Sequence, residues 1–117
     1  MTDIDVTELA ARLGEVRLVD VRTAGEYDGS LGQPCDPRQG HIPGASNLDV
    51  ARLMQLDAAE IDRELSLEPG SEIVAYCHSG SRSAIATQIL RSLGYDARNY
   101  PGSWHEWSRH DELPLET

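Results

Sequence analysis

The sequence predicts an α/β fold, a small open parallel sheet with helices on both faces. Short apolar segments of strand length alternate along the chain with segments that carry apolar residues at helical spacing. The run at residues 73–76 is apolar without interruption, as expected for a parallel strand that is buried on both faces. With 117 residues the chain can bury a hydrophobic core without disulfides, so we expect residues 1–117 to form a single domain.

The first elements follow from capping residues and apolar spacing. A short strand is expected near Ile4. Thr7 is a candidate N-cap for a helix over residues 8–13, which Gly14 ends. Residues 16–21 form the second expected strand.

The middle of the chain combines a loop with helical segments. Residues 28–39 are rich in Gly and Pro and are predicted to form a loop. Residues 45–48 are read as a short strand, and residues 49–67 as one or two helices. The apolar residues of these helices are expected to point inward: Leu53, Leu56, Ile61 and Leu65.

The last third begins with a strand over residues 73–77, which the turn-forming residues 69–71 precede. A helix is expected from Ser83 onward, with Gly94 as its C′ residue. Its apolar face would carry Ala84, Ile85, Ile89, Leu90 and Leu93. Residues 97–100 give a last short strand.

Two tryptophans close the predicted domain. Trp104 and Trp107 are three residues apart, so on a helical turn they share one face, which we expect to pack into the core. Gly102 and Ser103, just before them, are candidates for one wall of a pocket.

The composition argues against several classes of partner. The formal net charge of −10 disfavours binding to nucleic acids and to anionic membrane surfaces. No stretch reaches the roughly 20 apolar residues of a membrane span. Residues 1–5 are acidic rather than basic, unlike the start of a signal peptide. We therefore expect a cytoplasmic protein with neither nucleic acid nor membrane as a partner.

The cysteines and histidines suggest neither a disulfide nor a metal centre. Cys35 and Cys77 are the two cysteines, and a reducing compartment argues against a structural bridge between them. Four scattered histidines and two distant cysteines lack the spacing of metal ligands, so no metal site is predicted. No nucleotide-binding loop is present either, and no cofactor is expected.

Cys77 is the strongest candidate for chemistry. It ends a predicted strand and precedes a predicted helix, a position where ligands of open α/β sheets bind. The positive end of that helix and the nearby Arg82 favour thiolate over thiol, lowering the pKa of the cysteine from about 8.5. An inert buried cysteine is the alternative, but such a residue needs no Gly80 and no run of small hydroxyl residues after it.

The segment from Cys77 to Ser83 resembles the active-site loop of the rhodanese family of sulfurtransferases. Four further segments resemble other signatures of that family and occur in the family order: residues 18–22, 26–27, 40–45 and 102–107. Together they span nearly the whole chain. The resemblance implies a rhodanese-like domain, in which residues 28–39 are longer than the family pattern.

What the resemblance implies for function is sulfur transfer. Cys77 would take a sulfane sulfur from thiosulfate or a persulfide donor and hold it as a persulfide. The acceptor would be cyanide, a thiol such as glutathione or thioredoxin, or a protein. Backbone N–H groups of the loop would bind the anionic sulfur, which makes five residues the candidate substrate-binding set: His78, Ser79, Gly80, Ser81 and Arg82. Arg82 either assists with its side chain or only closes the loop.

Three other functions remain open. Cysteine phosphatases and the related arsenate reductases have a longer loop, whereas here four residues separate Cys77 from Arg82, a ring better suited to one sulfur atom than to phosphate. A non-catalytic binding module is the second alternative, although rhodanese domains of that kind have often lost the cysteine. A sulfur carrier with one dedicated partner is the third.

Other polar residues have two interpretations each. Asp20 and Arg22 border the expected active-site edge, but we favour an architectural role for them, and His41 fits a structural turn. Cys35 is either an incidental surface thiol, which we favour, or a second sulfur carrier that resolves the Cys77 persulfide. Arg38 could lend charge to an anionic donor.

Overall fold

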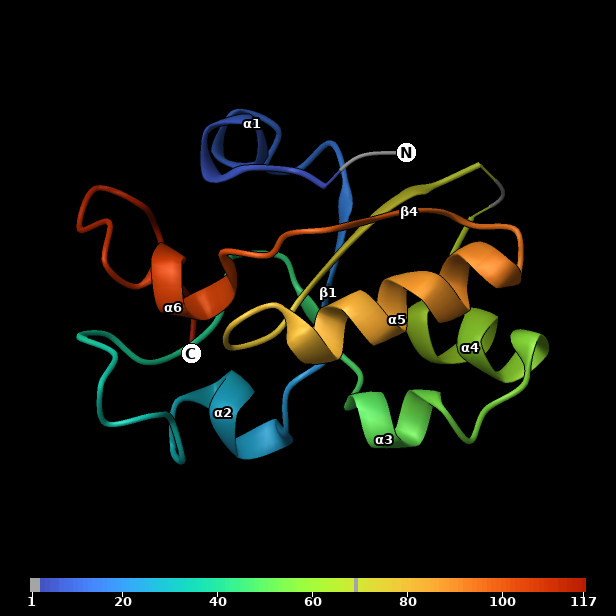
Figure 1. The fold of residues 1–117 in the computed structure, drawn as a ribbon, viewed down its shortest axis with the longest axis horizontal. Helices are drawn as coiled ribbons and strands as arrows, with labels where there is room; N and C mark the ends of the chain where they lie inside the picture. Colours follow the sequence, from blue (N-terminus) through green and yellow to red (C-terminus); the bar gives the residue numbers. More distant parts are fainter. Residues whose placement is uncertain (1–2, 69) are drawn as a thin grey trace.

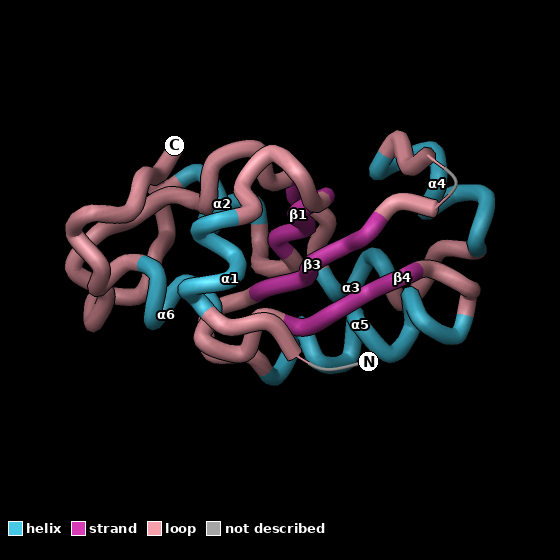
Figure 2. The backbone as a smooth tube through the Cα atoms, turned by 90° about the horizontal axis from the view of Figure 1, so that it is seen from above, coloured by secondary structure: helices cyan, strands magenta, loops and turns pink. Residues whose placement is uncertain are grey.

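The computed structural model describes residues 3–68 and 70–117, and its centre is a parallel sheet of four strands (Figure 1). Their order in the sheet is β2-β1-β3-β4. The strands are β1 (Arg17–Asp20), β2 (Ser46–Asn47), β3 (Glu72–Tyr76) and β4 (Asp96–Asn99). Figure 2 shows the three longer strands β1, β3 and β4 passing through the middle of the molecule. The expected open parallel sheet is therefore confirmed.

Helices cover both faces of this sheet, as predicted. Their bounds are α1 (Val6–Ala11), α2 (Ala24–Asp28), α3 (Val50–Leu53), α4 (Ala58–Leu65), α5 (Ser81–Ser92) and α6 (Ser103–Trp107). One buried cluster joins the sheet to α3, α4 and α5, and a second joins it to α1 and α6. Within the described ranges, no helix combines the length and apolarity needed to cross a membrane.

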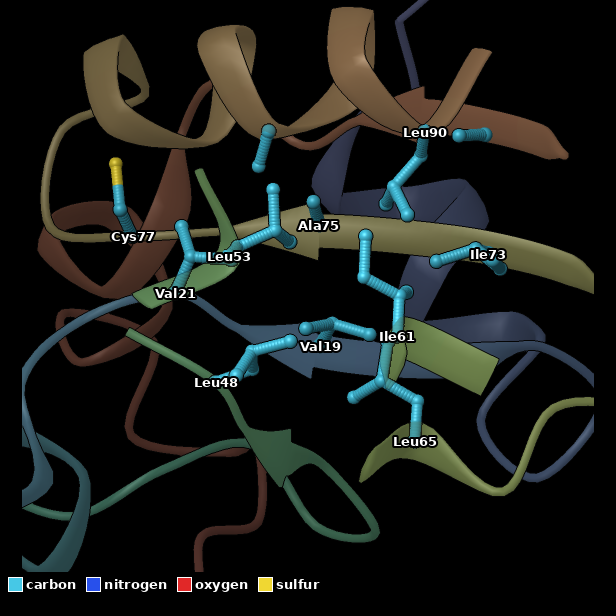
Figure 3. Close-up of a cluster of buried hydrophobic side chains, with 12 residues drawn as sticks. Val19, Val21, Leu48, Leu53, Ile61, Leu65, Ile73, Ala75, Cys77 and Leu90 are labelled. Atoms are coloured by element: carbon cyan, nitrogen blue, oxygen red, sulfur yellow. The ribbon is translucent and has the colours of Figure 1, made fainter. Parts of the chain in front are cut away.

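Side chains alternate between the two faces of β3, and Cys77 lies on the face that α3, α4 and α5 cover. Ile73, Ala75 and Cys77 belong to the cluster beneath α3, α4 and α5, whereas Val74 and Tyr76 face α1 and α6. Figure 3 shows Cys77 at the end of the first cluster, with its sulfur pointing toward the start of α5. The thiol therefore lies at the carboxyl edge of the sheet.

Near the N-terminus the structure differs from expectation. Ile4 is buried and its N–H donates to the Asn99 carbonyl, but it is not part of a strand. The cap of α1 is Asp5 rather than Thr7, because the Asp5 carboxylate accepts from the N–H of Glu8. These two predictions were wrong.

Helix α2 was not predicted. It begins at a capping box, in which Thr23 accepts from the N–H of Glu26 and the Glu26 carboxylate accepts from the N–H of Thr23. Gly29, with φ of 88°, ends it. A helix of five residues is too short to show an apolar period, so the capping box was its only signal in the sequence.

The other helices are close to expectation. Residues 49–67 form two helices, α3 and α4, and Gly94 adopts a left-handed conformation after α5. Helix α5 starts at Ser81 with Gly80 as N-cap, and no side chain caps it. The predicted start at Ser83 was therefore two residues too late. Of the predicted turn at residues 69–71, Pro69 lies outside the described residues, as do Met1 and Thr2 of the acidic N-terminus.

The long segment between α2 and β2 packs against α6. Asp28 ends α2, and residues 29–39 form neither helix nor strand. The Arg38 guanidinium donates to four carbonyl oxygens, those of Trp107, Ser108, His110 and Leu113. In return, the Trp104 indole N–H donates to the Arg38 carbonyl. Arg38 thus holds the C-terminal segment, and the charge that it could lend to an anionic donor stays a prediction.

Candidate active site

Cys77 follows β3 directly and is 1% exposed. Its sulfur accepts hydrogen bonds from the Gly80 N–H at 3.1 Å, the Ser83 N–H at 3.4 Å and the Ser83 hydroxyl at 3.4 Å. The hydroxyl of Ser103 lies 4.0 Å away. The sulfur therefore lies in a ring of neutral donors around the start of α5.

These donors lower the pKa of Cys77. Burial raises the pKa of the thiol, because a thiolate is poorly solvated in the interior. Hydrogen bonds from the Ser83 hydroxyl and from the N–H groups of Ser83, Gly80 and Ser79 favour the thiolate and outweigh burial. The pKa of Cys77 is therefore lowered, which favours a nucleophilic sulfur.

Gly80 gives the loop its shape. Its φ is +97°, and a Cβ at this position would lie 2.6 Å from the Pro101 carbonyl oxygen. Its own carbonyl accepts from the Asn99 side chain at 3.3 Å and lies 3.2 Å from the Ser83 hydroxyl, whose one proton it shares with the Cys77 sulfur. Only a glycine combines this backbone conformation with so close an approach to the neighbouring chain.

Ser103 supports the loop from α6. Its hydroxyl accepts from the Cys77 N–H at 3.0 Å and donates to the Tyr100 carbonyl at 2.8 Å. Its φ of 55° is left-handed, an unusual conformation for a residue with a side chain. The Trp104 N–H donates to the Cys77 carbonyl at 2.9 Å, so the first turn of α6 fixes the backbone of the cysteine.

Arg82 forms an ion pair with Glu26. The guanidinium donates to both carboxylate oxygens, at 2.9 Å and 3.1 Å. Burial raises the pKa of Glu26, but Arg82 and the N-cap Thr23 more than offset it and lower that pKa to about 2. Of the two roles left open for Arg82, the geometry favours closing the loop against α2.

The remaining loop residues face outward or toward the long segment. Ser79 and Ser81 are exposed. His78 is partly buried, and its Nε2 lies 3.0 Å from Oδ2 of Asp36. Cys35 and His105 lie beside this pair, and one potential ligand atom from each of the four residues falls within 4.8 Å of all the others.

Asp20 and Arg22 form a buried ion pair with an N···O distance of 2.7 Å. Arg22 also donates to the Gly40 carbonyl, and its guanidinium lies 5.2 Å from the centre of the Trp104 ring. His41 stacks on Tyr27 at 3.7 Å. All three polar side chains thus have structural contacts, in agreement with the architectural roles expected for them.

Two supporting residues, Ser83 and Glu26, were not recognised as part of the site from the sequence. From the sequence, Ser83 was expected only to end the loop and to begin the following helix. Its position on the first turn of α5, above a thiol at the strand end, is the signal that could have identified it. The partner of Arg82 lies 56 positions away in the chain, and no local pattern reveals such a contact.

Comparisons with known proteins agree on one family. The model of the rhodanese-like domain matches residues 5–110. A thiosulfate sulfurtransferase of Pseudomonas aeruginosa is 34% identical over 119 residues, which cover 92% of this chain and 43% of that protein. A crystal structure of a probable thiosulfate sulfurtransferase shares 43% identity with a TM-score of 0.83, covering 98% of this chain and 47% of the other.

A structure of EanB with a cysteine persulfide, in a tetrahedral intermediate state with ergothioneine, superposes with a TM-score of 0.87. It is 27% identical, and the match covers 98% of this chain and 28% of that protein. The chain thus spans less than half the length of each of these three relatives.

Proposed function

Because the chain belongs to the rhodanese-like domain family, we propose that it is a sulfurtransferase that carries sulfane sulfur on Cys77. The observation that carries this proposal is the ring of neutral donors around the Cys77 sulfur. A ring that stabilises the thiolate also suits the terminal sulfur of a persulfide, which is anionic as well.

In the first half-reaction the Cys77 thiolate attacks the outer sulfur of thiosulfate. A new S–S bond forms to Cys77, the S–S bond of thiosulfate breaks, and its electron pair leaves with sulfite. The products are a Cys77 persulfide anion and the sulfite dianion, so total charge is conserved and no external oxidant is needed. A low-molecular-weight persulfide serves as a donor in the same way, with a thiolate as the leaving group.

In the second half-reaction an acceptor nucleophile attacks the outer sulfur of the persulfide. Cyanide gives thiocyanate, and a thiolate gives a new persulfide; in both cases Cys77 leaves as its thiolate. The role of the loop is to stabilise the departing thiolate with the Gly80 and Ser83 donors. Thiols such as glutathione or thioredoxin, or a protein acceptor, are the cellular counterparts of cyanide.

The size and depth of the site favour sulfur over phosphorus. Four residues separate Cys77 from Arg82, and the thiol is 1% exposed. In thiosulfate or a persulfide the attacked sulfur is a terminal atom, which can enter such a site alone, whereas a phosphoryl group is attacked at its central atom. Arg82, which would bind phosphate oxygens in a phosphatase, is paired with Glu26.

The remaining expectations are part of the same proposal. Residues 1–117 form a single domain that acts in the cytoplasm, where reducing conditions keep Cys35 and Cys77 as thiols. Small-molecule donors and acceptors are its partners, rather than nucleic acid. Of the five candidate binding residues, His78, Ser79, Gly80, Ser81 and Arg82, we expect Gly80 and Ser79 to contribute through their backbone N–H groups.

The test is intact-mass spectrometry after incubation with thiosulfate, followed by cyanide. The wild-type chain and Cys35→Ser should each gain the mass of one sulfur atom and lose it on adding cyanide, with thiocyanate released. Cys77→Ser should gain none. This pattern would also make Cys35 a bystander in the transfer.

Failure has a distinct signature. If no sulfane donor modifies the wild-type chain, the transferase proposal is wrong and the non-catalytic binding module takes its place. Hydrolysis of an aryl phosphate that depends on Cys77 would instead support the phosphatase alternative. A persulfide that is stable to cyanide and thiols would indicate a dedicated sulfur carrier.

A further inference from the structure

Four potential metal ligands meet beside the active-site loop. They are Cys35 and Asp36 from the long segment after α2, His78 from the loop, and His105 from α6. One ligand atom of each, a sulfur, a carboxylate oxygen and two imidazole nitrogens, lies within 4.8 Å of the other three. Because these residues are far apart along the chain, their spacing did not predict a metal site.

Asp36 supplies an independent sign of a ligand. Its side chain is 1% exposed, and its Oδ1 accepts from Arg109 at 3.0 Å. Its Oδ2 is buried and has no hydrogen-bond partner among the described residues. A buried carboxylate oxygen without a hydrogen bond is costly and rare in folded proteins.

His78 has the complementary feature. Its Nε2 is also buried and without a hydrogen-bond partner in the described part of the chain, although it lies only 3.0 Å from Asp36 Oδ2. The two atoms are thus close, yet their geometry is not that of a hydrogen bond. With the His78 proton on Nδ1, both atoms present lone pairs, and one cation between them satisfies both.

We propose that Cys35, Asp36, His78 and His105 form a binding site for a single Zn²⁺ ion. A thiolate, two imidazoles and a carboxylate make a borderline-soft ligand set that suits zinc and excludes magnesium or calcium. Tetrahedral zinc holds its ligand atoms about 3.3–3.8 Å apart. Cys35 and His105 are exposed, so rotation of their side chains can close the remaining distance. For His105 this rotation would replace the present contact of its Nδ1 with Arg109 at 3.3 Å.

The surroundings support these ligands. Arg109 donates to the carbonyls of Cys35 and His105 as well as to Asp36, and so holds the backbone of two ligands and the carboxylate of a third. The thiolate and the carboxylate together supply two negative charges for Zn²⁺, and the carboxylate also bonds the guanidinium of Arg109. The rings of His78 and His105 already lie edge to face, with centres 5.3 Å apart.

A site with four protein ligands leaves no open coordination position, so it is structural rather than catalytic. Its effect is to tie the long segment and α6 to the residue that follows Cys77. The His105 N–H already donates to the His78 carbonyl at 2.9 Å, and the metal would add a second link between the same two residues. Zinc should therefore stabilise the loop without entering the sulfur chemistry.

Cobalt titration tests the site, because Co²⁺ replaces zinc and reports its ligands by absorption. The full chain with Cys77→Ser, stripped of metal with a chelator, should bind one Co²⁺ with a thiolate charge-transfer band and the visible bands of tetrahedral cobalt. Adding Cys35→Ser should abolish the thiolate band, and adding His105→Ala should weaken binding at least tenfold. His110→Ala, a matched histidine just after α6 and outside the cluster, should bind as tightly as the parent.

Zinc provides a second readout. It should raise the Tm of Cys77→Ser, and the increase should disappear when Cys35→Ser is added. Absence of Co²⁺ binding in both the wild-type chain and Cys77→Ser would overturn the proposal. So would a thiolate band that persists without Cys35 but is lost without Cys77, because it would assign the metal to the active-site thiol. None of these readouts depends on sulfur transfer.

Discussion

Arg82 and Glu26 form a two-point ion pair, with N···O distances of 2.9 Å and 3.1 Å, that joins the active-site loop to α2. Glu26 also completes the capping box of α2 through Thr23. One carboxylate thus fixes both the start of a helix and the end of the loop. The guanidinium already has an anionic partner, so the groups that donate to the Cys77 sulfur are neutral ones.

Replacing Glu26 with Gln should make the free energy of unfolding less dependent on pH in the acid range. The pKa of Glu26 is about 2 in the folded protein against 4.5 for the reference group, so its ionised form stabilises the fold above pH 4.5. That contribution is lost as the pH falls toward 2. Since Arg82 is one-third exposed, we expect about 2 kcal/mol at neutral pH after allowing for solvent screening.

Urea unfolding at pH 7 and pH 3 measures this effect for Glu26→Gln. The free energy of unfolding of the variant should differ less from that of the wild-type chain at pH 3 than at pH 7. Glu60→Gln is the matched control, since Glu60 completes the capping box of α4 at an exposed helix end. Equal losses for the two variants at both pH values would contradict a special role for the Arg82 pair.

Replacing Ser83 with Ala should make Cys77 less reactive. The variant loses the hydroxyl donor 3.4 Å from the sulfur, so the pKa of Cys77 should rise and less thiolate should be present at neutral pH. The rate of alkylation by iodoacetamide at neutral pH, measured with Cys35→Ser and a chelator present, should therefore fall. At high pH, where Cys77 is ionised in the variant and in its parent, the two alkylation rates should converge.

Ser92→Ala is the control for this experiment. Its hydroxyl donates to the carbonyl three residues earlier on the same helix, as that of Ser83 does, but at the far end from Cys77. Its alkylation profile should match that of the parent. If Ser83→Ala reacted as fast as Ser92→Ala at neutral pH, the hydroxyl would have no part in ionising the thiol.

Replacing Gly80 with Ala should destabilise the fold more than the left-handed backbone alone explains. The new Cβ would approach the Pro101 carbonyl to 2.6 Å, and φ is +97°. We expect a loss of about 2–4 kcal/mol in the free energy of unfolding. Gly94→Ala has nearly the same φ, +95°, with nothing within 4 Å of its Cβ, so it should lose only about 1–2 kcal/mol. Equal losses in urea unfolding would rule out the clash.

Replacing Ser103 with Ala should leave the Cys77 N–H without its acceptor. The cost of such an unpaired buried group is about 1–3 kcal/mol. Urea unfolding measures it, with Ser66→Ala as a control at an exposed residue that also has a positive φ. A loss no larger than that of the control would show that the hydroxyl adds nothing to stability.

Features with a local cause were predictable from the sequence. The continuous apolar run of β3, the glycine after α5 and the small residues after Cys77 each reflect a constraint that acts over a few residues. They were sufficient to predict the parallel sheet and the strand-end position of the thiol. The burial of Trp104 and Trp107 also followed from their spacing.

Features that depend on contacts between distant segments were not predictable. The partners of Arg82, Arg38 and Asp36 lie tens of residues away along the chain. The long segment after α2 has no apolar period, because carbonyl oxygens and one buried carboxylate hold it rather than a hydrophobic face. The prediction of the α1 N-cap was wrong for a simpler reason. Asp5 and Thr7 lie two residues apart, and both residue types are good N-caps.

The neutral donors around Cys77 have a consequence for the response of the protein to ionic strength. Dissolved salt screens charges that reach solvent, over a Debye length of about 10 Å at 0.1 M, but scarcely affects short hydrogen bonds to a buried atom. The Gly80 and Ser83 donors should therefore lower the pKa of Cys77 to a similar extent at low and at high salt concentration. Added salt should act elsewhere, by weakening the repulsion between an anionic donor and a chain of net charge −10.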